Sequence, residues 1–142
     1  MTATAENPTK SVEVLLVEDN HTDVYFIREA LKQSKYSVRL GVVFDGVRAL
    51  AYLRHQGHFA NTANPDLILL DLNMPSMDGW EVLTEIKRDP HLQQIPVLVV
   101  TTSGNEEDKM RARELRAGSY IVKPMNMIQF PALVNAVERF LG

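Results

Sequence analysis

One stretch near the middle of the chain decides the fold: Leu67-Ile-Leu-Leu-Asp71-Leu-Asn73. Its first four residues are all large and apolar, and an acidic side chain follows them directly. An unbroken apolar run of this kind is typical of a strand that is covered on both faces, as the inner strands of a parallel sheet are. We therefore expect a central strand over residues 67–70, with Asp71 at its carboxyl end.

Short apolar runs alternate with helical patterns on both sides of this strand. The other predicted strands cover residues 12–17, 37–43, 95–100 and 120–122, and the predicted helices cover residues 21–34, 46–56, 79–88, 106–117 and 127–141. In the second helix, the residues expected to face the core are Val47, Leu50, Ala51 and Leu53. Five units of strand followed by helix predict the α/β class: a doubly wound, five-stranded parallel sheet with right-handed crossovers and helices on both faces.

Length and composition limit the class of protein. The chain has 142 residues, which fits one domain over residues 12–142 after a polar tail over residues 1–11. It has no cysteine, which excludes disulfide scaffolds and thiolate metal sites. No apolar run approaches the roughly 20 residues of a membrane span, and the N-terminus has no signal pattern. The net charge of −3 gives no electrostatic reason to bind nucleic acid. We therefore expect a soluble, cytoplasmic protein without a nucleic-acid or membrane partner.

Polar side chains stand at the carboxyl ends of four predicted strands. In chain order, these are Glu18 with Asp19, then Asp71 with Asn73, then Thr101, then Lys123. Taken singly, such residues are most often turn residues, helix caps or strand formers. In open parallel sheets, however, ligands bind outside the carboxyl ends of the strands. We therefore expect all of these side chains at one edge of the sheet.

The residue types at this edge indicate magnesium-dependent phosphoryl chemistry. Three converging carboxylates repel one another unless a cation lies among them. Oxygen ligands without Cys or His suit a hard ion, above all Mg²⁺, which binds one or two carboxylates together with a phosphoryl oxygen. Asp71 beside this ion could attack phosphorus and become an aspartyl phosphate. Lys123 and Thr101 would then bind the other phosphoryl oxygens.

These motifs resemble those of response-regulator receiver domains, which have the fold of the chemotaxis regulator. Residues 67–79 resemble the phosphoacceptor loop, residues 14–19 the first strand with its acidic pair, residues 99–101 the switch strand and residues 119–124 the lysine strand. The resemblance covers about residues 12–142. It implies a flavodoxin-like strand order of 2-1-3-4-5. It also implies a phosphoacceptor signalling protein rather than an enzyme, because such a domain catalyses only its own phosphorylation and dephosphorylation.

The resemblance assigns a phosphoacceptor and a set of metal ligands. Asp71 would accept the phosphoryl group from the phosphohistidine of a sensor histidine kinase in a two-component phosphorelay. Asp19, the Asp71 carboxylate and the backbone carbonyl of Asn73 would bind Mg²⁺, for which Mn²⁺ or Ca²⁺ could substitute in a crystal. Glu18 would support the metal through a water molecule.

The resemblance also implies how the signal leaves the site. Lys123 would pair with the phosphoryl group, and its peptide bond to Pro124 is expected to be cis. Thr101 would move to the phosphate, and Tyr120 would turn inward behind it. The change is expected to reach the face formed by the last two predicted helices and the strand between them, which would bind a partner protein or a second copy in a homodimer.

Two positions depart from the usual pattern of the family. Glu18 stands where Asp is commonest, and Thr102 stands where a small residue is usual, so the bulk of Thr102 is expected to crowd an attacking water or a small phosphodonor. A narrower resemblance, to the small response regulators of cyanobacterial phytochromes, is carried by residues 101–103, the extended loop 57–65 and the closing helix. It implies a light-regulated kinase, a phytochrome, as donor and a homodimeric regulator.

Two other functions fit parts of the pattern. A phosphatase of the haloacid-dehalogenase type also uses an Asp nucleophile and Mg²⁺, but it needs a second Asp as general acid where this chain has Asn73. A pseudo-receiver, which binds partners without being phosphorylated, has the same fold. The presence of Glu18, Asp19, Asp71, Thr101 and Lys123 argues against that function.

Overall fold

The strands form one parallel sheet. The computed structural model describes residues 10–74, 77–123 and 126–142. Its strands are β1 (Ser11–Val17), β2 (Ser37–Val43), β3 (Leu67–Leu70), β4 (Val97–Thr101) and β5 (Ser119–Val122). They pair in the order β2-β1-β3-β4-β5, and every pairing is parallel. This confirms the predicted α/β class, the doubly wound parallel sheet and the strand order.

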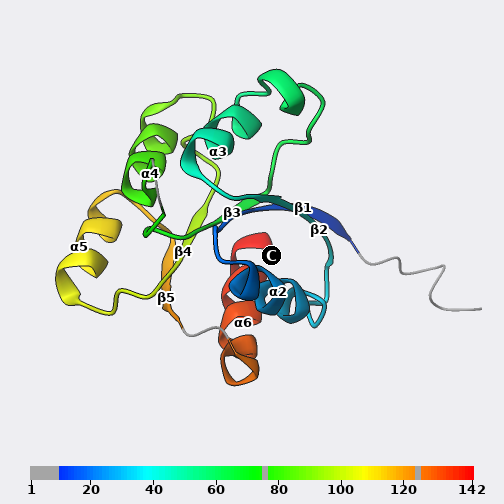
Figure 1. The fold of residues 1–142 in the computed structure, drawn as a ribbon. Coiled ribbons are helices and arrows are strands. Elements are labelled where there is room, and N and C mark those ends of the chain that lie inside the picture. Colours follow the sequence, from blue (N-terminus) through cyan, green and yellow to red (C-terminus); the bar gives the residue numbers. More distant parts are fainter. Residues whose placement is uncertain (1–9, 75–76, 124–125) are drawn as a thin grey trace, which may run out of the picture.

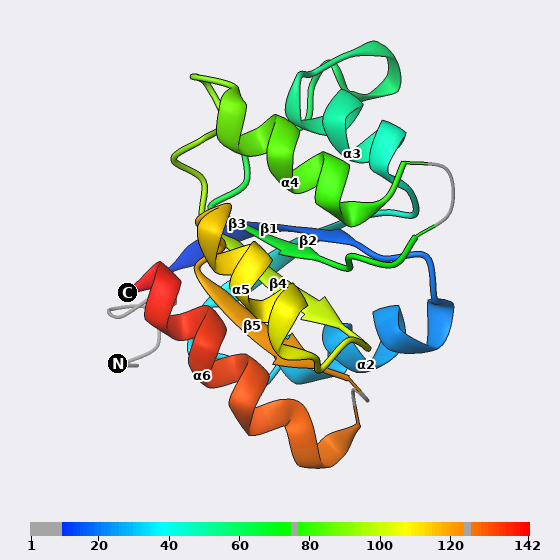
Figure 2. The ribbon, with the colours of Figure 1, turned by 90° about the vertical axis from the view of Figure 1, so that its left-hand side faces the viewer.

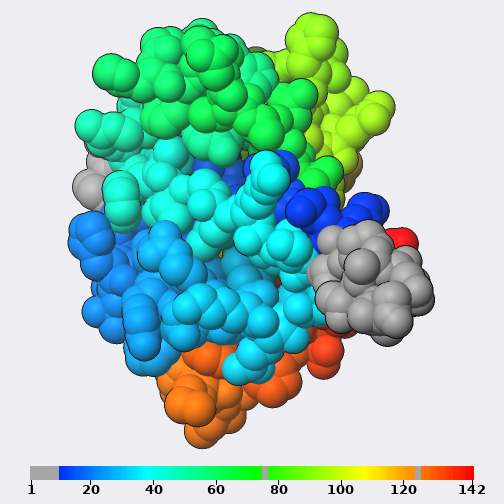
Figure 3. All heavy atoms as spheres, turned by 90° about the vertical axis from the view of Figure 1, so that its right-hand side faces the viewer, coloured from blue at the N-terminus to red at the C-terminus, as the bar shows by residue number. Residues whose placement is uncertain are grey.

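Helices cover both faces of the sheet. They are α2 (His21–Leu31), α3 (Gly46–Leu53), α4 (Gly79–Arg88), α5 (Glu106–Glu114) and α6 (Phe130–Leu141), with short 3₁₀ turns η1 (Gly57–Phe59) and η2 (Met127–Gln129). Figure 1 shows α2 and α6 together on one face and α3 and α4 on the other, with α5 beside β5. The edge at β2 is seen in Figure 3, where the blue and cyan atoms of α2 and β2 lie next to each other.

Alternate residues of the inner strands supply two separate cores. Leu16, Leu69 and Leu98 pack with α2 and α6, whereas Leu15 and Ile68 pack with α3 and α4. All five side chains are at most 1% exposed. Because both faces of these strands are buried, their sequences are continuously apolar, which is why the run at 67–70 predicted a central strand correctly.

Several predicted helices are too long at their carboxyl ends. The predicted ends at residues 34, 56 and 117 become Leu31, Leu53 and Glu114. Shortly after α3 and α5, His55 and Arg116 have φ angles of 56° and 64°, a left-handed conformation that ends a helix. The last predicted helix begins as the turn η2 and becomes α-helical only at Phe130.

The buried face of α3 differs from the predicted one. Val47 is 58% exposed, and the buried residues are Gly46, Ala49, Leu50 and Leu53. A β-carbon on Gly46 would lie 2.6 Å from the carbonyl oxygen of Met77 and 2.7 Å from a methyl of Val82, which shows how closely α3 approaches the start of α4. This approach is possible only with glycine facing α4, so the helix is rotated and Val47 points outward.

Parts of the sequence predictions lie outside the described residues. These parts are residues 1–9 of the predicted tail and Pro124, which includes the predicted cis bond. Within the described residues, no helix has the length and apolar character needed to cross a membrane.

Candidate functional site

Backbone hydrogen bonds continue the sheet beyond the strand ends and bring the site together. The amide of Glu18 donates to the carbonyl of Val43 at 3.0 Å, and the amide of Asp71 donates to the carbonyl of Val17 at 3.0 Å. The amide of Lys123 donates to the carbonyl of Thr101 at 2.7 Å. In Figure 2 the strands run toward the right-hand side, where β1 turns into the start of α2. The predicted site residues therefore gather at one edge of the sheet.

Three acidic side chains converge at this edge. Glu18, Asp19 and Asp71 each offer a carboxylate oxygen, and these oxygens lie within 4.8 Å of one another. Glu18 and Asp71 are 0% and 4% exposed, whereas Asp19 is half-buried. A hollow of about 350 Å³ opens over them. Buried carboxylates at this spacing repel one another, so the arrangement suits a cation.

The ammonium of Lys123 lies among the carboxylates. Its Nζ atom is 2.8 Å from Oε1 of Glu18, 2.8 Å from Oδ2 of Asp23 and 3.5 Å from Oδ2 of Asp71. The Lys123 side chain is only 6% exposed. One ammonium thus faces three carboxylates, and because its side chain is buried, these electrostatic interactions are less screened than in water.

Burial and charge shift the pKa of two of these groups. Burial raises the pKa of Glu18 well above its ordinary value, and although Lys123 opposes the increase, the neighbouring charge of Asp71 adds to it. Burial alone would lower the pKa of Lys123, but Asp23, Glu18 and Asp71 raise it above its ordinary value. Lys123 is therefore a fixed positive charge in this site.

The acidic cluster fits a hard divalent cation. Oε1 of Glu18 is buried, and its polar contact among the described residues is the ion pair with the Lys123 ammonium. The cluster offers only oxygen ligands, which is the donor set that Mg²⁺ prefers. Asp19 and Asp71 could bind the ion directly, and Glu18 could accept a hydrogen bond from a metal-bound water.

We expect Mg²⁺ to stabilise the protein through this cluster. A ligand that binds only the folded state raises the free energy of unfolding, by about 2.7 kcal/mol at 100 times its Kd. Thermal unfolding with Mg²⁺ and with a chelator would measure the increase. Asp19→Asn should abolish it, whereas Glu85→Gln, which removes an exposed carboxylate paired with Arg54, should retain it. An Asp19→Asn protein with the full increase would rule out this metal site.

Asn73 links the end of β3 to the end of β4. Its side-chain amide donates to Oγ1 of Thr101 at 3.1 Å and to Oγ1 of Thr102 at 3.2 Å. Its backbone amide donates to Oδ1 of Asp71 at 3.1 Å. Thr101 is fully buried, whereas Thr102 is exposed at the mouth of the site. The sequence did not predict the contact between Asn73 and the two threonines, which depends on β3 and β4 being neighbours.

Tyr120 lies on β5, opposite Val99 of the neighbouring strand β4. Its side chain is partly buried against the core on the α3 and α4 side, and its hydroxyl donates to the carbonyl of Ser103 at 2.8 Å. Ser103 in turn donates from its hydroxyl to Asp108 in α5 at 2.5 Å. The aromatic side chain is thus connected to the segment that joins β4 to α5.

Sequence analysis missed one residue of the site, Asp23. It belongs to the first turn of α2, where its backbone amide donates to Oδ1 of the helix cap Asn20 at 3.0 Å. An acid at this position is common, because it interacts favourably with the helix N-terminus. That ordinary role concealed the contact with Lys123, which the sequence places at the far end of the chain.

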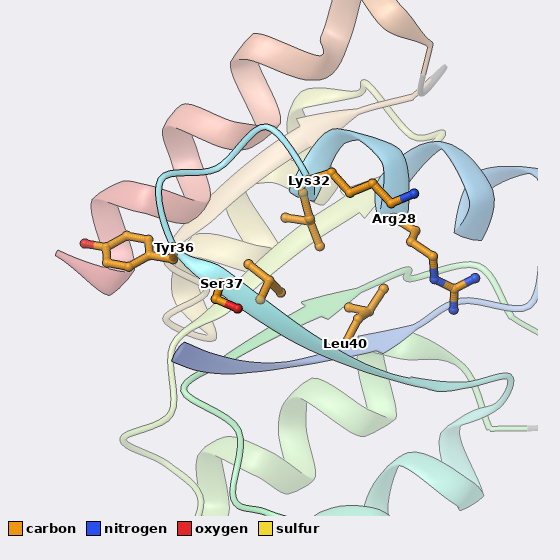
Figure 4. A pocket seen from close by; sticks show the side chains of 7 residues that line it. Arg28, Lys32, Tyr36, Ser37 and Leu40 are labelled. Carbon is orange, nitrogen blue, oxygen red and sulfur yellow. The ribbon is translucent and has the colours of Figure 1, made fainter. Parts of the chain in front are cut away.

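A hollow of similar size elsewhere shows that volume alone does not identify the site. It measures about 400 Å³ and lies between α2 and β2 (Figure 4). Its lining residues include Arg28 of α2, Lys32 directly after α2 and Leu40 of β2, and none of them is acidic. Within the part of the chain that the structure describes, the hollow at the strand ends combines carboxylates with a buried ammonium, which this second hollow does not.

Comparison with known proteins finds relatives along nearly the whole chain. The family model of the response regulator receiver domain matches residues 14–136. The response regulator Rcp1 of Synechocystis sp. is 44% identical over 134 residues, which are 94% of this chain and 90% of Rcp1. The probable methanogenesis regulatory protein FilR2 of Methanothrix harundinacea is 38% identical, over 89% of this chain and 81% of FilR2.

Solved structures agree with these relatives. The phosphorylated cyanobacterial phytochrome response regulator RcpA aligns with a TM-score of 0.83 and 47% identity, over 92% of this chain and 93% of RcpA. The Mn²⁺-bound form of Rcp1 aligns with a TM-score of 0.82 and 43% identity, over 92% of this chain and 94% of Rcp1.

Proposed function

Because this chain belongs to the response regulator receiver domain family, we propose that Asp71 receives a phosphoryl group from the phosphohistidine of a sensor histidine kinase. The observation that carries the proposal is the position of the Asp71 carboxylate. It is almost fully buried at the end of β3, within reach of two acidic neighbours and 3.5 Å from the Lys123 ammonium. Glu18 shares this burial and these neighbours, but its Oε1 lies only 2.8 Å from the Lys123 ammonium, whereas the ammonium is 3.5 Å from Oδ2 of Asp71.

The transfer follows from the chemistry of the site. An oxygen of Asp71 forms a bond to phosphorus while the nitrogen–phosphorus bond of the donor breaks, and the imidazole nitrogen keeps the electron pair. A Mg²⁺ ion held by Asp19, Asp71 and the backbone carbonyl of Asn73, with Glu18 bound through water, would neutralise charge on the phosphoryl oxygens. Lys123 would pair with one of those oxygens, and the hydroxyl of Thr101 would donate to another.

Phosphorylation would change the structure on the side of the site formed by β4, β5 and α5. If Thr101 turns toward the phosphoryl group, its contact with Asn73 is lost and Tyr120 can move into the space behind it. The neighbouring helix α5 is loosely held, because Ala112 is the one residue of α5 that is buried. Its exposed Met110 and its arginines would present an altered surface, formed by α5, β5 and α6, to a partner or to a second copy in a homodimer.

The relatives suggest the source of the signal. RcpA is a cyanobacterial phytochrome response regulator, and this chain is 47% identical to it over 92% of its residues. We therefore propose that the donor kinase is a phytochrome. The cytoplasmic location predicted from the sequence belongs to the same proposal, since the phosphoryl donor is made from ATP inside the cell.

One measurement tests the proposal directly. The protein would be incubated with Mg²⁺ and acetyl phosphate, or with a phytochrome kinase and ATP, and its mass determined before and after. A gain of one phosphoryl group at Asp71 is expected. An unchanged mass with both donors would favour the pseudo-receiver, and rapid turnover of small phosphoesters would favour a phosphatase. We do not expect phosphatase turnover, because Asn73 stands where such a phosphatase needs a general acid and its amide cannot donate an acidic proton.

Lys123→Ala should separate metal binding from signalling. The carboxylates remain, so Mg²⁺ should still bind. The ammonium that would pair with the phosphoryl group is removed, so the signal should not be transmitted. We expect NMR signals of α5 and β5 to shift in the wild-type protein when acetyl phosphate is added, and to stay in place in the variant. Lys32→Ala, which removes an exposed lysine paired with Glu29, should respond like the wild type. A full response in Lys123→Ala would contradict the proposed switch.

A further inference from the structure

The Lys123 ammonium is held more closely by α2 than by the proposed phosphoacceptor. Its distance to Oδ2 of Asp23 is 2.8 Å, within hydrogen-bond range, whereas its distance to Oδ2 of Asp71 is 3.5 Å. An ammonium has three protons to donate. Two of its near neighbours, Glu18 and Asp23, lie at 2.8 Å, so the contact with Asp71 is the weakest of the three.

The local structure of α2 fixes Asp23 in this position. Asn20 caps the helix and binds the backbone amide of Asp23, while Val24 and Ile27 are buried against the sheet. With the helix anchored on one face, the Asp23 carboxylate is directed toward the strand ends, and its side chain is 18% exposed. Asp23 and Lys123 also line the same hollow as the acidic cluster.

Building on the proposed function, we infer that Asp23 is a positioning residue that holds the Lys123 ammonium beside α2 until Asp71 is phosphorylated. A phosphoryl group brings close to two negative charges and three acceptor oxygens to the Asp71 side of the ammonium. Lys123 then moves from Asp23 to the phosphoryl group. Because the ion pair with Asp23 exists before this movement and not after it, Asp23 stabilises the unphosphorylated state selectively.

Loss of the Asp23 charge should therefore favour the phosphorylated-like state. Asp23→Asn is nearly isosteric and leaves the cap by Asn20 in place. We expect the variant to bind beryllium trifluoride, a non-covalent analogue of the phosphoryl group, about fivefold more tightly than the wild type in the presence of Mg²⁺. A fivefold change corresponds to about 1 kcal/mol, the upper range for a partly exposed ion pair.

Matched variants separate this effect from a general change of charge. Glu29→Gln also removes one carboxylate from α2, but that carboxylate pairs with the exposed Lys32. It should bind beryllium trifluoride like the wild type. Asp23→Glu keeps the charge and should restore most of the wild-type affinity.

The direction in which the Lys123 signal moves provides a second measurement, separate from the affinity for beryllium trifluoride. The Lys123 side chain is only 6% exposed, so its ammonium protons should exchange slowly enough for its nitrogen to be followed by NMR. In Asp23→Asn without beryllium trifluoride, this signal should move part of the way toward its position in the liganded wild type. In Glu29→Gln it should not move.

The outcomes are distinct. Tighter binding together with a shifted Lys123 signal, in Asp23→Asn alone, supports the inference. Unchanged or weaker binding overturns it, and so does tighter binding with a Lys123 signal that does not move toward its position in the liganded wild type. If the wild-type protein itself fails to bind beryllium trifluoride with Mg²⁺, the proposed function fails and this inference fails with it.

Discussion

Asp71→Asn is expected to abolish phosphorylation by acetyl phosphate and by a kinase, while leaving the fold intact. The amide of asparagine is not a nucleophile toward phosphorus. The neighbouring Asp19 should not replace Asp71 as phosphoacceptor, because it does not stand at the end of β3. Because the replacement is isosteric and removes one of three converging carboxylates that repel one another, the free energy of unfolding without metal should not fall. Mass spectrometry and chemical denaturation would measure the two effects.

Asp66→Asn is the matched control for this variant. Asp66 immediately precedes β3, whereas Asp71 immediately follows it, so the two acids stand at opposite ends of one strand. Asp66 is exposed and accepts a hydrogen bond from the amide of Glu13 at 2.8 Å, which an asparagine can also accept. It should be phosphorylated like the wild type. Persistent labelling of Asp71→Asn at another residue would overturn the assignment of the phosphoacceptor.

Gly79→Ala is expected to cause the second large loss, in both stability and phosphorylation. Gly79 is the first residue of α4, and its amide donates to the carbonyl of Leu72 at 3.0 Å. A β-carbon at this position would overlap the carbonyl oxygen of Asp71 and Cα of Leu72, and would lie 2.9 Å from the carbonyl carbon of Asp71. These are backbone atoms, which cannot rotate away, so the loop that carries the phosphoacceptor must shift.

The expected magnitude follows from two opposing contributions. Overpacking of this kind costs about 1–3 kcal/mol, and a more favourable helix propensity offsets up to about 1 kcal/mol of it. Because the clash is with backbone atoms, we take the upper end of the overpacking range. After the offset, the free energy of unfolding should fall by about 2 kcal/mol. The rate of phosphorylation by acetyl phosphate should fall at least about tenfold, because small displacements of a reacting group slow a reaction strongly.

Gly104→Ala is the control for that prediction. Gly104 lies between β4 and α5, and a β-carbon there would meet only the methyl groups of Val122, at 3.6 and 3.9 Å, which is ordinary packing. Its stability and phosphorylation rate should stay close to those of the wild type. If Gly79→Ala were as stable and as readily phosphorylated as Gly104→Ala, the close approach of α4 to the Asp71 loop would not be needed for stability or for phosphorylation.

The sequence alone determined the fold class and the strands that carry the site. The strand over 67–70 and the helix over 79–88 were predicted with their observed ends, because both lie between strong local signals. Continuous apolar runs identify strands that are buried on both faces, and a polar residue directly after such a run marks its carboxyl end. Strand order then brought Glu18, Asp71 and Lys123 to one edge.

Other features could not be predicted from local patterns. The rotation of α3, which exposes Val47, depends on the close approach of Gly46 to Met77 and Val82. A pattern of apolar residues at helical spacing fits two adjacent faces equally well in a helix of eight residues. Which face is buried is decided by the neighbouring helix.

Only the tertiary structure decided which charges pair inside the site. Asp23 carries the local signal of a helix N-terminus, and Lys123 that of a residue after a short strand, yet their side chains meet at 2.8 Å. Likewise, the amide of Asn73 reaches Thr101 because β3 and β4 are adjacent. Such contacts join residues that are distant in the chain, and their energies depend on distance and burial. Sequence patterns record neither of these quantities.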